Sequence, residues 1–489
     1  MSQHKEKVIR SVREAMGLAY AELRWLTEAE AKKANQEREE LIRSFSNRVN
    51  YGSAGTKVYT GNLSPGCLIC GQGTWSCIYM NGLCTSNCFY CPQDRGIKEE
   101  REARTDNVQF RAPRDYVDYL KLLGFEGAGF SGGEPFIVFD KLCSYLECIR
   151  DEFGQEFYLW VYTNGDLVDK KKLKTLKALG LNEIRFNISA GNYGLEKVEL
   201  AIPEIETVTV EIPAIPEDYP VVLEKMALME KMGVRHLNLH QLLVNEHNYR
   251  KLARRGYSFL HQRQAAVLES ELAALKLIRH ALEQDLTLPV NYCCAHYKTT
   301  FQRRGYRTRT AWLVKKPFED LTDTGHIRQL SVRASSVKIE ELIRIFRQNR
   351  EPENHWSWDG NTDELFIHAS LTKYMNGGGE GVALTYFEPS MMEGNCDGRT
   401  AQHFTFQSGR QVAVTRRVVA SHKGLSDRAV TGFRQLCLEN RDSQDVYRDF
   451  IRDYPLKEKE DRNRMLTEKD ALIHAKNLER IEIGLPELF

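Results

Sequence analysis

The chain has 489 residues, of which 42% are hydrophobic and 28% are charged, as expected for an ordinary soluble globular protein. Its 68 Lys and Arg residues nearly balance its 67 Asp and Glu residues, so the overall charge does not support binding to nucleic acid. The first residues are charged and polar, unlike a secretory signal, and no apolar run is long enough for a membrane helix. We therefore expect a cytoplasmic protein with no membrane partner.

Residues 1–50 are rich in Glu, Lys, Arg, Ala and Leu and contain no Pro, a composition that predicts one or two amphipathic helices. This N-terminal helical extension could brace or cover the rest of the chain, or it could be a solvated leader with no function of its own. Residues 51–74 are rich in Gly and Cys and predict a loop that ends the helical pattern.

Strand-like and helix-like runs alternate in residues 75–300, which we predict to be the core domain. Six strand candidates begin at Trp75, Gly127, Tyr158, Glu183, Thr207 and His236. Helix candidates lie between them, and some end with a glycine near the C-cap. Repeated β-then-α units predict a parallel sheet with right-handed crossovers. If this sheet curls into a barrel, the active site should lie at the C-terminal ends of its strands.

Residues 301–489 predict an accessory region of mixed helices and strands. It begins with a basic stretch, Arg303 to Lys316, that could meet a phosphorylated or peptide substrate, although a solvated surface is the more common explanation. A tight turn is predicted at residues 376–380. Strand candidates in this region begin at Glu364, Gly381, His403 and Gln411.

Cysteines cluster strongly in one part of the chain. Of the twelve cysteines, six lie close together, namely Cys67, Cys70, Cys77, Cys84, Cys88 and Cys91. In a long chain without a secretory signal, such clustering favours metal binding over disulfide bonds.

Cys84, Cys88 and Cys91 form a CxxxCxxC motif, with Tyr90 just before the third cysteine. Three thiolates on a short loop can bind three irons of a cubane iron–sulfur cluster. The fourth iron then lacks a protein ligand, which leaves an open site for a substrate or cosubstrate. The alternative is a zinc knuckle, but zinc motifs usually combine two CxxC pairs, or one CxxC with two His, and the triad matches neither pattern.

The chain resembles the radical S-adenosylmethionine superfamily, and in particular the group related to the pyruvate formate-lyase-activating enzyme. The matching segments are CTSNCFYC, from Cys84 to Cys91, and SGGEP, from Ser131 to Pro135, each at the end of a strand candidate. The resemblance covers about residues 75–245. It implies an α/β fold with a partial (β/α)6 TIM-like barrel, flanked by the N-terminal helical extension and the C-terminal α+β region.

The same resemblance implies two cofactors, a 4Fe–4S cluster and S-adenosylmethionine, and a reductant partner such as a ferredoxin or flavodoxin. In this family the open iron chelates S-adenosylmethionine, whose reductive cleavage gives a 5′-deoxyadenosyl radical that abstracts hydrogen from a substrate. We expect this activity on an unidentified peptide, protein or small molecule. The sequence identifies no further catalytic residue.

Three other functions remain open. Within the family, the chain could activate a glycyl-radical enzyme, although its length argues against this because such activases are usually small. From another class, it could be a non-catalytic zinc-binding interaction protein. An electron carrier is the third alternative, but a carrier would not need the SGGEP segment.

The resemblance assigns Gly132, Gly133 and Glu134 to the motif that receives the amino group of S-adenosylmethionine, and the glycines would permit close backbone approach. It places Tyr90 near the adenine. Further candidates for binding this cosubstrate lie at later strand ends, where a structural hydrogen bond is the alternative role. They are Thr163, Asn164, Asn187, Ser189, Glu211 and His240.

Cys67, Cys70 and Cys77 precede the triad and suggest a second metal site, because a CxxC in a Gly- and Pro-rich loop is typical of a ligand hairpin. The metal would be an auxiliary iron–sulfur cluster or zinc. A fourth ligand could come from Cys293, Cys294 or His296. Cys77 could instead be a small buried hydrophobic residue.

Overall fold

The computed structural model describes residues 3–93, 103–105, 108–262, 264–375, 381–394, 401–439, 443–452, 459–481, 484–486 and 488. These residues divide into two units. The first contains the described residues of 1–306, 406–410 and 482–489, and the second those of 307–405 and 411–481. The turn predicted at residues 376–380 lies outside the described residues.

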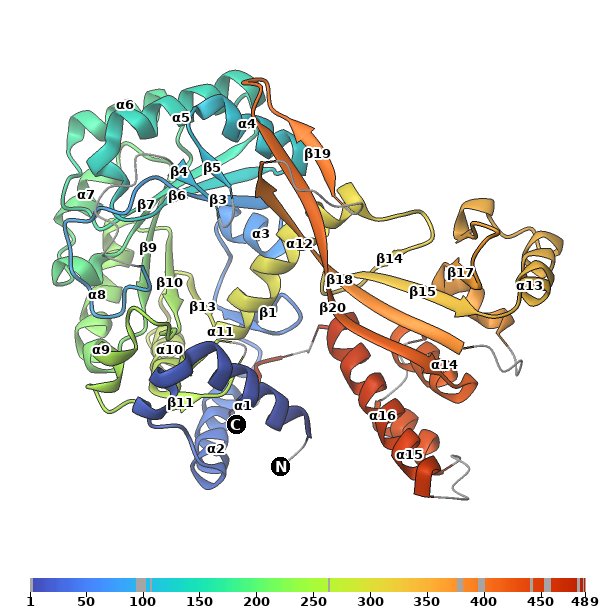
Figure 1. Cartoon of the computed structure of the whole chain (residues 1–489). Coiled ribbons are helices and arrows are strands. Elements are labelled where there is room, and N and C mark those ends of the chain that lie inside the picture. The colour runs from blue at the N-terminus through green and yellow to red at the C-terminus, as the bar shows by residue number, and fades with distance from the viewer. Residues whose placement is uncertain are drawn as a thin grey trace. The chain divides into compact units, whose positions relative to one another are not determined.

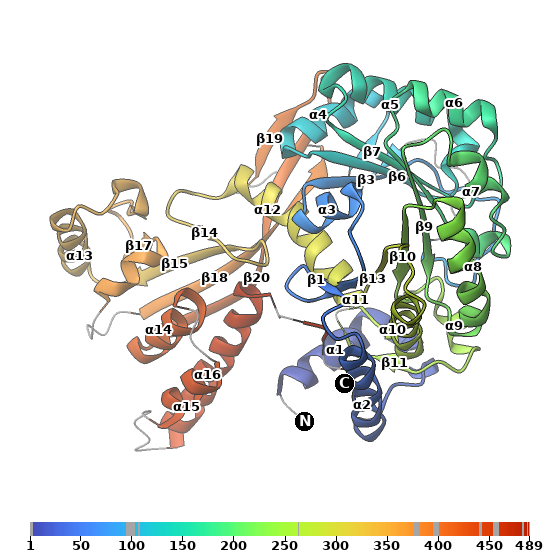
Figure 2. The same cartoon turned by 180° about the vertical axis from the view of Figure 1, so that it is seen from behind.

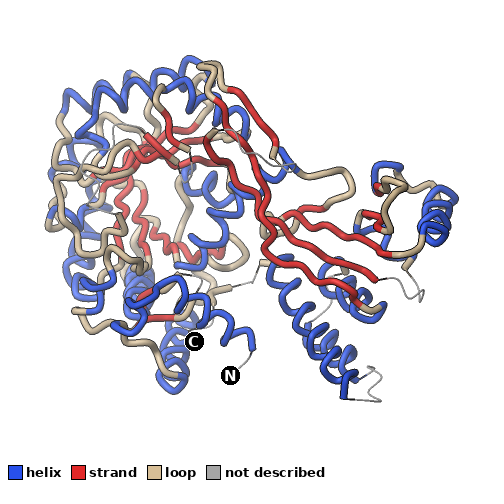
Figure 3. Tube along the Cα trace, viewed as in Figure 1, coloured by secondary structure: helices blue, strands red, loops and turns tan. Residues whose placement is uncertain are grey.

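The first unit is built on an eleven-stranded sheet. Short antiparallel strands extend both of its edges, namely β1 (Asn50–Gly52), β2 (Lys57–Tyr59), β4 (Ala103–Arg104) and β5 (Gln109–Phe110). Seven parallel strands lie between them: β3 (Trp75–Tyr79), β6 (Gly127–Ser131), β7 (Tyr158–Thr163), β8 (Glu183–Phe186), β9 (Thr207–Pro213), β10 (His236–His240) and β13 (Val290–Cys293). The sheet curves, and within the described residues its two edge strands do not pair, so the barrel is open (Figures 1 and 3).

The predicted partial barrel is confirmed, and all six predicted strands are present. A seventh parallel strand, β13, pairs with β10 and extends the barrel beyond the six strands predicted for it. Another difference concerns the end of β8, which stops at Phe186. The next residues, Ile188–Gly191, form a 3-10 turn, so Asn187 and Ser189 follow the strand and do not alternate along it.

Helices connect the parallel strands and cover the outer face of the sheet (Figure 1). They are α4 (Pro113–Leu123), α5 (Phe139–Phe153), α6 (Lys170–Ala178), α7 (Glu196–Ala201), α8 (Tyr219–Met232) and α10 (Leu268–Glu283). Each buries an apolar stripe, as Leu142, Leu146 and Ile149 do in α5. Gly124 ends α4 with a φ of 60°, a left-handed conformation that glycine adopts without steric cost.

The segment predicted as a loop at residues 51–74 contains regular structure. It holds most of the β1–β2 hairpin and helix α3 (Pro65–Gln72). Ser64 caps this helix by accepting a hydrogen bond from the Cys67 amide, and Gly73 ends it with a φ of 74°. The loop prediction was wrong because Pro in the first turn and Gly at the C-cap mark the two ends of a helix.

The N-terminal extension forms α1 (Gln3–Met16) and α2 (Glu28–Ser44), and α2 packs beside α10 (Figure 2). Thr27 and Glu30 make a capping box at the start of α2. The side chain of Trp25 stacks on that of His261 with the ring centroids 4.2 Å apart. The extension therefore packs against the barrel.

Shorter elements follow β10 in the first unit. They are α9 (Tyr249–Ala253), β11 (Phe259–Leu260), β12 (Ala266–Val267), α11 (Ala295–Tyr297) and the π-helical turn Lys298–Gln302, after which α12 (Arg303–Val314) begins. The predicted basic stretch is thus mainly helical.

The second unit contains an antiparallel sheet with helices α13 (Ser336–Gln348), α14 (Asp427–Phe433), α15 (Ser443–Arg452) and α16 (Lys459–Glu479). Its core includes Leu342, Phe346, Leu384, Phe433 and Leu472. The strands are β14 (Asp320–Leu321), β15 (Ile327–Arg333), β16 (Trp356–Ser357), β17 (Glu364–Ile367), β18 (Gly381–Glu393), β19 (Gln402–Thr405) and β20 (Gln411–Leu425). No helix among the described residues combines the length and the apolar composition that crossing a membrane requires.

Candidate active site

A cavity of about 950 Å³ lies within the first unit, where the predicted site residues meet. The cysteine triad and the SGGEP turn both line it, as do side chains from several strands. The predicted residues that line the cavity are Cys67, Cys70, Cys77, Cys84, Cys88, Tyr90, Cys91, Gly132, Gly133, Glu134, Thr163, Asn164, Asn187, Glu211, His240 and Cys293. The triad and the turn follow β3 and β6, at the strand ends where barrel enzymes carry their active sites.

The SGGEP turn packs tightly against the backbone that precedes the triad. The Gly133 amide donates to the Asn81 carbonyl at 2.8 Å, and the Glu134 amide donates to the Leu83 carbonyl at 2.6 Å. A Cβ atom on Gly133 would lie 1.8 Å from the Leu83 oxygen. Gly132 has a φ of 119°, which side-chain-bearing residues rarely adopt. Both glycines are therefore required for the turn to approach this backbone.

Glu134 is buried, and its carboxylate is held by three donors. It accepts hydrogen bonds from the Phe136 amide at 3.0 Å, the Thr163 hydroxyl at 2.9 Å and the Asn164 amide at 2.8 Å. Burial raises the pKa of Glu134. Glu134 and Thr163 thus connect the turn to the end of β7, and their contact with S-adenosylmethionine stays a prediction.

Side-chain amides hold the triad loop at both ends. The Asn164 side chain donates to Thr85 at 2.7 Å and to Ser86 at 3.0 Å. At the other end, the Asn248 side chain donates to the carbonyl of Tyr90 at 3.0 Å, and that of Asn245 to the carbonyl of Pro92 at 2.6 Å. Asn245 and Asn248 were not predicted from the sequence, although their amide side chains shortly after the end of β10 could have indicated a role at the site.

Tyr90, Asn187 and Ser189, all predicted to bind S-adenosylmethionine, contact one another. The Tyr90 hydroxyl lies 2.6 Å from that of Ser189, which donates to the Asn187 side-chain carbonyl at 2.6 Å. Burial raises the pKa of Tyr90, so its phenol is neutral. The three side chains form one polar cluster beside the triad loop.

The triad fits a 4Fe–4S cluster by its ligand chemistry. Three cysteines of one loop line a single cavity, and the rest of that cavity leaves space for a non-protein ligand. Over the described parts of the chain, no three His, Cys, Asp or Glu side chains converge as ligands of one metal ion. A cubane does not need such convergence, because each cysteine binds a different iron. When bound, this cluster supplies the electron for reductive cleavage of S-adenosylmethionine.

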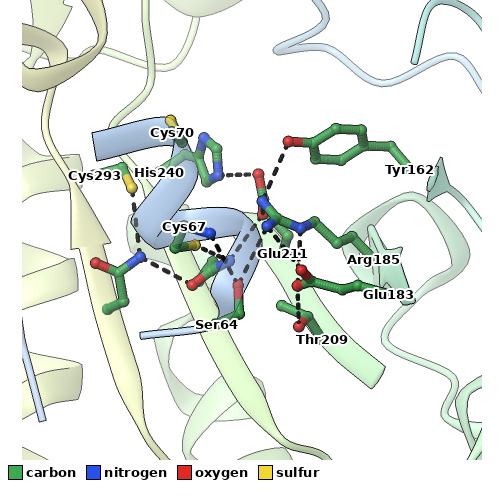
Figure 4. A network of polar contacts seen from close by, with 12 residues as sticks. Ser64, Cys67, Cys70, Tyr162, Glu183, Arg185, Thr209, Glu211, His240 and Cys293 are labelled. Atoms are coloured by element: carbon green, nitrogen blue, oxygen red, sulfur yellow. Dashed lines mark hydrogen bonds and ion pairs between the residues drawn. The ribbon is translucent and has the colours of Figure 1, made fainter. Parts of the chain in front are cut away.

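A second part of the cavity, which we call the charged wall, consists of Lys57, Arg185, Glu211, His240 and Lys298. Arg185 Nη1 lies 2.9 Å from the Glu211 carboxylate, and His240 Nε2 lies 2.6 Å from its other oxygen (Figure 4). Although burial opposes its charge, Glu211 has a lowered pKa because His240 and Arg185 stabilise the carboxylate. Burial lowers the pKa of His240.

Glu211 was predicted to bind S-adenosylmethionine, but both its carboxylate oxygens are already engaged. Besides Arg185 and His240, the Asn238 side chain donates to it at 2.9 Å. The arrangement therefore gives the predicted cofactor contact of Glu211 no support. Arg185 also pairs with Glu183 at 3.0 Å, so one guanidinium connects two buried carboxylates.

The cysteines proposed for a second metal site are only partly brought together. Cys67 and Cys70 lie on α3 and adjoin Cys293 of β13 (Figure 4). All three thiols lie near the ammonium of Lys57. Cys77 lies on β3, which is the outermost parallel strand on the side of the sheet opposite β13. The described residues hold no three-ligand group for a single ion, so a zinc site made of Cys67, Cys70 and Cys77 is not supported, whereas an auxiliary iron–sulfur cluster stays a prediction. The helical geometry of α3, absent from the prediction, explains the difference.

The other proposed ligands are engaged elsewhere. The Cys294 thiol donates to the Thr56 carbonyl at 3.1 Å and accepts from the Tyr297 amide at 3.3 Å. His296 Nδ1 lies 3.4 Å from the Thr300 hydroxyl. Of the three alternatives for a fourth ligand, only Cys293 adjoins the CxxC pair.

Sequence analysis also missed Lys57, Arg185 and Lys298 of the charged wall. Part of the signal was present, because polar residues alternate with apolar ones along three strands. The alternating polar residues are Glu183 and Arg185 in β8, Thr209 and Glu211 in β9, and Asn238 and His240 in β10. Alternation in a strand places such residues on one face, here the inner face of the barrel.

Comparison with known proteins points to one family. A family model described as the radical SAM superfamily matches residues 78–199, which include the triad and the SGGEP turn. A Methanocaldococcus jannaschii protein, provisionally named a glycyl-radical enzyme activating enzyme, is 29% identical over 298 residues, or 59% of this chain and 78% of that protein.

Solved structures with some similarity include Streptococcus suis SuiB bound to its precursor peptide SuiA, with 12% identity and a TM-score of 0.35. That match covers 56% of this chain and 55% of SuiB, so this chain spans little more than half of SuiB. Escherichia coli coproporphyrinogen III oxidase, a radical SAM enzyme, matches with 10% identity and a TM-score of 0.26 over 85% of this chain and 93% of that one.

The matched segment contains both motifs that line the cavity of the partial barrel. The cofactors are those of the family, a 4Fe–4S cluster and S-adenosylmethionine, and the protein is an enzyme of this class. The chain therefore contains a radical S-adenosylmethionine superfamily domain, which the family model matches over residues 78–199.

Proposed function

We propose that Cys84, Cys88 and Cys91 hold the cluster, that the turn at Gly132 and Gly133 holds the amino end of S-adenosylmethionine, and that the enzyme acts on a small polar molecule. The observation that carries this proposal is the lining of one cavity by the triad, the turn and the charged wall. An electron donor such as a ferredoxin or flavodoxin would reduce the cluster.

The chain's own residues would position the cosubstrate and exclude water. Backbone carbonyls of the SGGEP turn can accept hydrogen bonds from the amino group, because the glycines leave the backbone accessible. The cluster of Tyr90, Asn187 and Ser189 offers hydroxyl and amide groups that can contact the sugar. Enclosure by the barrel protects a reactive species from solvent.

A small polar substrate is favoured by the charged wall. Buried charges are costly unless they are paired, so the five ionisable side chains of the charged wall suit a ligand with polar groups of its own. Sites for small molecules typically have volumes of about 300–1,000 Å³, and this cavity lies within that range.

Activation of a glycyl-radical enzyme is the second candidate, because the Methanocaldococcus jannaschii relative carries that name. This function would require a backbone loop of a partner protein to enter the cavity. Such a loop presents an uncharged glycine and would make little use of Arg185 and Glu211.

Two measurements separate these candidates. The full chain, reconstituted with iron and sulfide without oxygen, should form 5′-deoxyadenosine from S-adenosylmethionine when reduced by dithionite. A small-molecule filtrate of the source cells should increase this rate if the substrate is a metabolite. A glycyl-radical signal in the paramagnetic resonance spectrum of an added partner protein, without stimulation by the filtrate, would favour the activase.

A further inference from the structure

Lys57 is a buried cation without a carboxylate partner. Its side chain lies on β2 opposite Cys293 of β13, and the residue is 1% exposed. Its ammonium lies 4.4 Å from the centroid of the Tyr297 ring. In the part of the chain that the structure describes, no carboxylate forms an ion pair with it. A buried charge in this position is expensive unless an anion neutralises it.

Lys298 lines the same cavity, at the start of the π-helical turn Lys298–Gln302. Its ammonium forms no ion pair with any described carboxylate. Burial lowers the pKa of Lys298, and the nearby Cys293 and Glu211 oppose this shift. Arg185 differs, because Glu183 and Glu211 both pair with it. The wall and its supporting Glu183 thus contain one arginine and two lysines but only two carboxylates, and both carboxylates contact the arginine.

Cysteine thiolates are the alternative counterions. Cys67, Cys70 and Cys293 surround Lys57, and as thiolates they would raise its pKa despite burial. However, burial raises the pKa values of Cys70 and Cys293, which favours neutral thiols. The Tyr297 hydroxyl also donates to Cys70 Sγ at 3.2 Å, a contact that a neutral sulfur can accept. Neutral thiols would leave the charge of Lys57 without compensation.

We propose that the substrate carries an anionic group, a carboxylate or a phosphate, that binds between Lys57 and Lys298. This inference rests on the proposed function in one respect, namely that the cavity accommodates a small molecule. It narrows the substrate class to small anions. The ligand group would supply the ion-pair partner that no described carboxylate provides for these two lysines.

Calorimetric titration of the reconstituted full chain tests the inference without any turnover. Inorganic phosphate and succinate are titrated separately, in the absence of S-adenosylmethionine, to distinguish a phosphate site from a carboxylate site. At least one should bind saturably. Lys57→Met and Lys298→Met should each weaken that binding by about tenfold or more, since each removes a charged hydrogen-bond donor. Lys276→Met is the matched control, because Lys276 lies on α10 and pairs with Glu37 at 2.8 Å.

Thermal unfolding gives a second readout, which shows whether cysteine thiolates already neutralise Lys57 or whether its counterion must come from a ligand. Without added anion, Lys57→Met should raise the Tm, because it removes an uncompensated buried charge. A lower Tm would show that thiolates already neutralise Lys57 and would overturn the inference. Anion binding that is absent, unchanged in both lysine variants, or displaced by S-adenosylmethionine would also overturn it. A chain that binds the anion but never forms 5′-deoxyadenosine would instead reject the proposed function alone.

Discussion

Arg185 Nη1 lies 2.9 Å from the Glu211 carboxylate, and this buried pair connects the neighbouring strands β8 and β9 inside the barrel. The same guanidinium contacts Glu183 at 3.0 Å. The Thr209 hydroxyl donates to the Glu183 carboxylate at 2.6 Å, so a hydrogen bond fixes this carboxylate in addition to the ion pair. One arginine therefore forms ion pairs with two carboxylates that face the interior of the sheet.

Replacement of this arginine should destabilise the fold strongly. Arg185→Met leaves the buried Glu183 without a cationic partner and leaves Glu211 with only His240 and Asn238, so we expect the free energy of unfolding to fall by about 3–5 kcal/mol. Urea unfolding measures this change. Arg255→Met is the control, because the exposed pair of Arg255 with Glu217 should contribute less than about 1 kcal/mol. Equal losses in the two variants would contradict the assigned role of Arg185.

The contact of the N-terminal extension with the barrel should be sensitive to acid. Burial and the nearby Arg13 lower the pKa of His261 to about 4, from an ordinary value of 6.5. Between these values the unfolded chain binds a proton that the folded chain does not, so stability falls as the pH decreases from 6.5 to 4. Unfolding measured across this range should show the loss. His261→Phe retains a ring against Trp25 and should reduce the slope, and an unchanged slope would contradict the assignment.

The SGGEP turn should not tolerate a side chain at its second glycine. In Gly133→Ala the new Cβ would overlap the Leu83 carbonyl, so we expect a loss of about 1–3 kcal/mol in stability and a loss of S-adenosylmethionine binding. Equilibrium dialysis measures the binding. Gly191→Ala provides the control, since the nearest atom to its added Cβ is 4.0 Å away. Normal binding of S-adenosylmethionine by Gly133→Ala would show that binding does not require the close approach of the turn to Leu83.

The CxxC pair on α3 should not hold a zinc ion. Within the described residues, Cys67 and Cys70 have no third ligand placed to bind the same single ion. Cys67→Ser and Cys70→Ser should therefore leave the zinc content of the purified chain unchanged by elemental analysis. A fall in zinc would contradict this prediction, and a fall in iron with the Cys84 site intact would support an auxiliary cluster.

The sequence was sufficient for features that depend on local patterns. The six strands, the triad and the SGGEP turn each carry a compact signal, and the cavity brings the two motifs together. The charged wall was harder to predict, because Lys57 and Lys298 come from segments far apart in the chain. The second metal site depends on a similar question: Cys67 and Cys77 are close in sequence and line the same cavity, but they lie on different elements, α3 and β3. Long-range packing decides such cases.

Formation of 5′-deoxyadenosine is the most direct test of the central claim. The reduced, reconstituted chain should convert S-adenosylmethionine to 5′-deoxyadenosine, whereas Cys84→Ala, Cys88→Ala and Cys91→Ala should each lose the cluster absorption and the product. Cys143→Ala, on the outer helix α5, should retain both. A wild-type chain with an intact cluster that forms no 5′-deoxyadenosine, or triad variants that form it normally, would contradict the account.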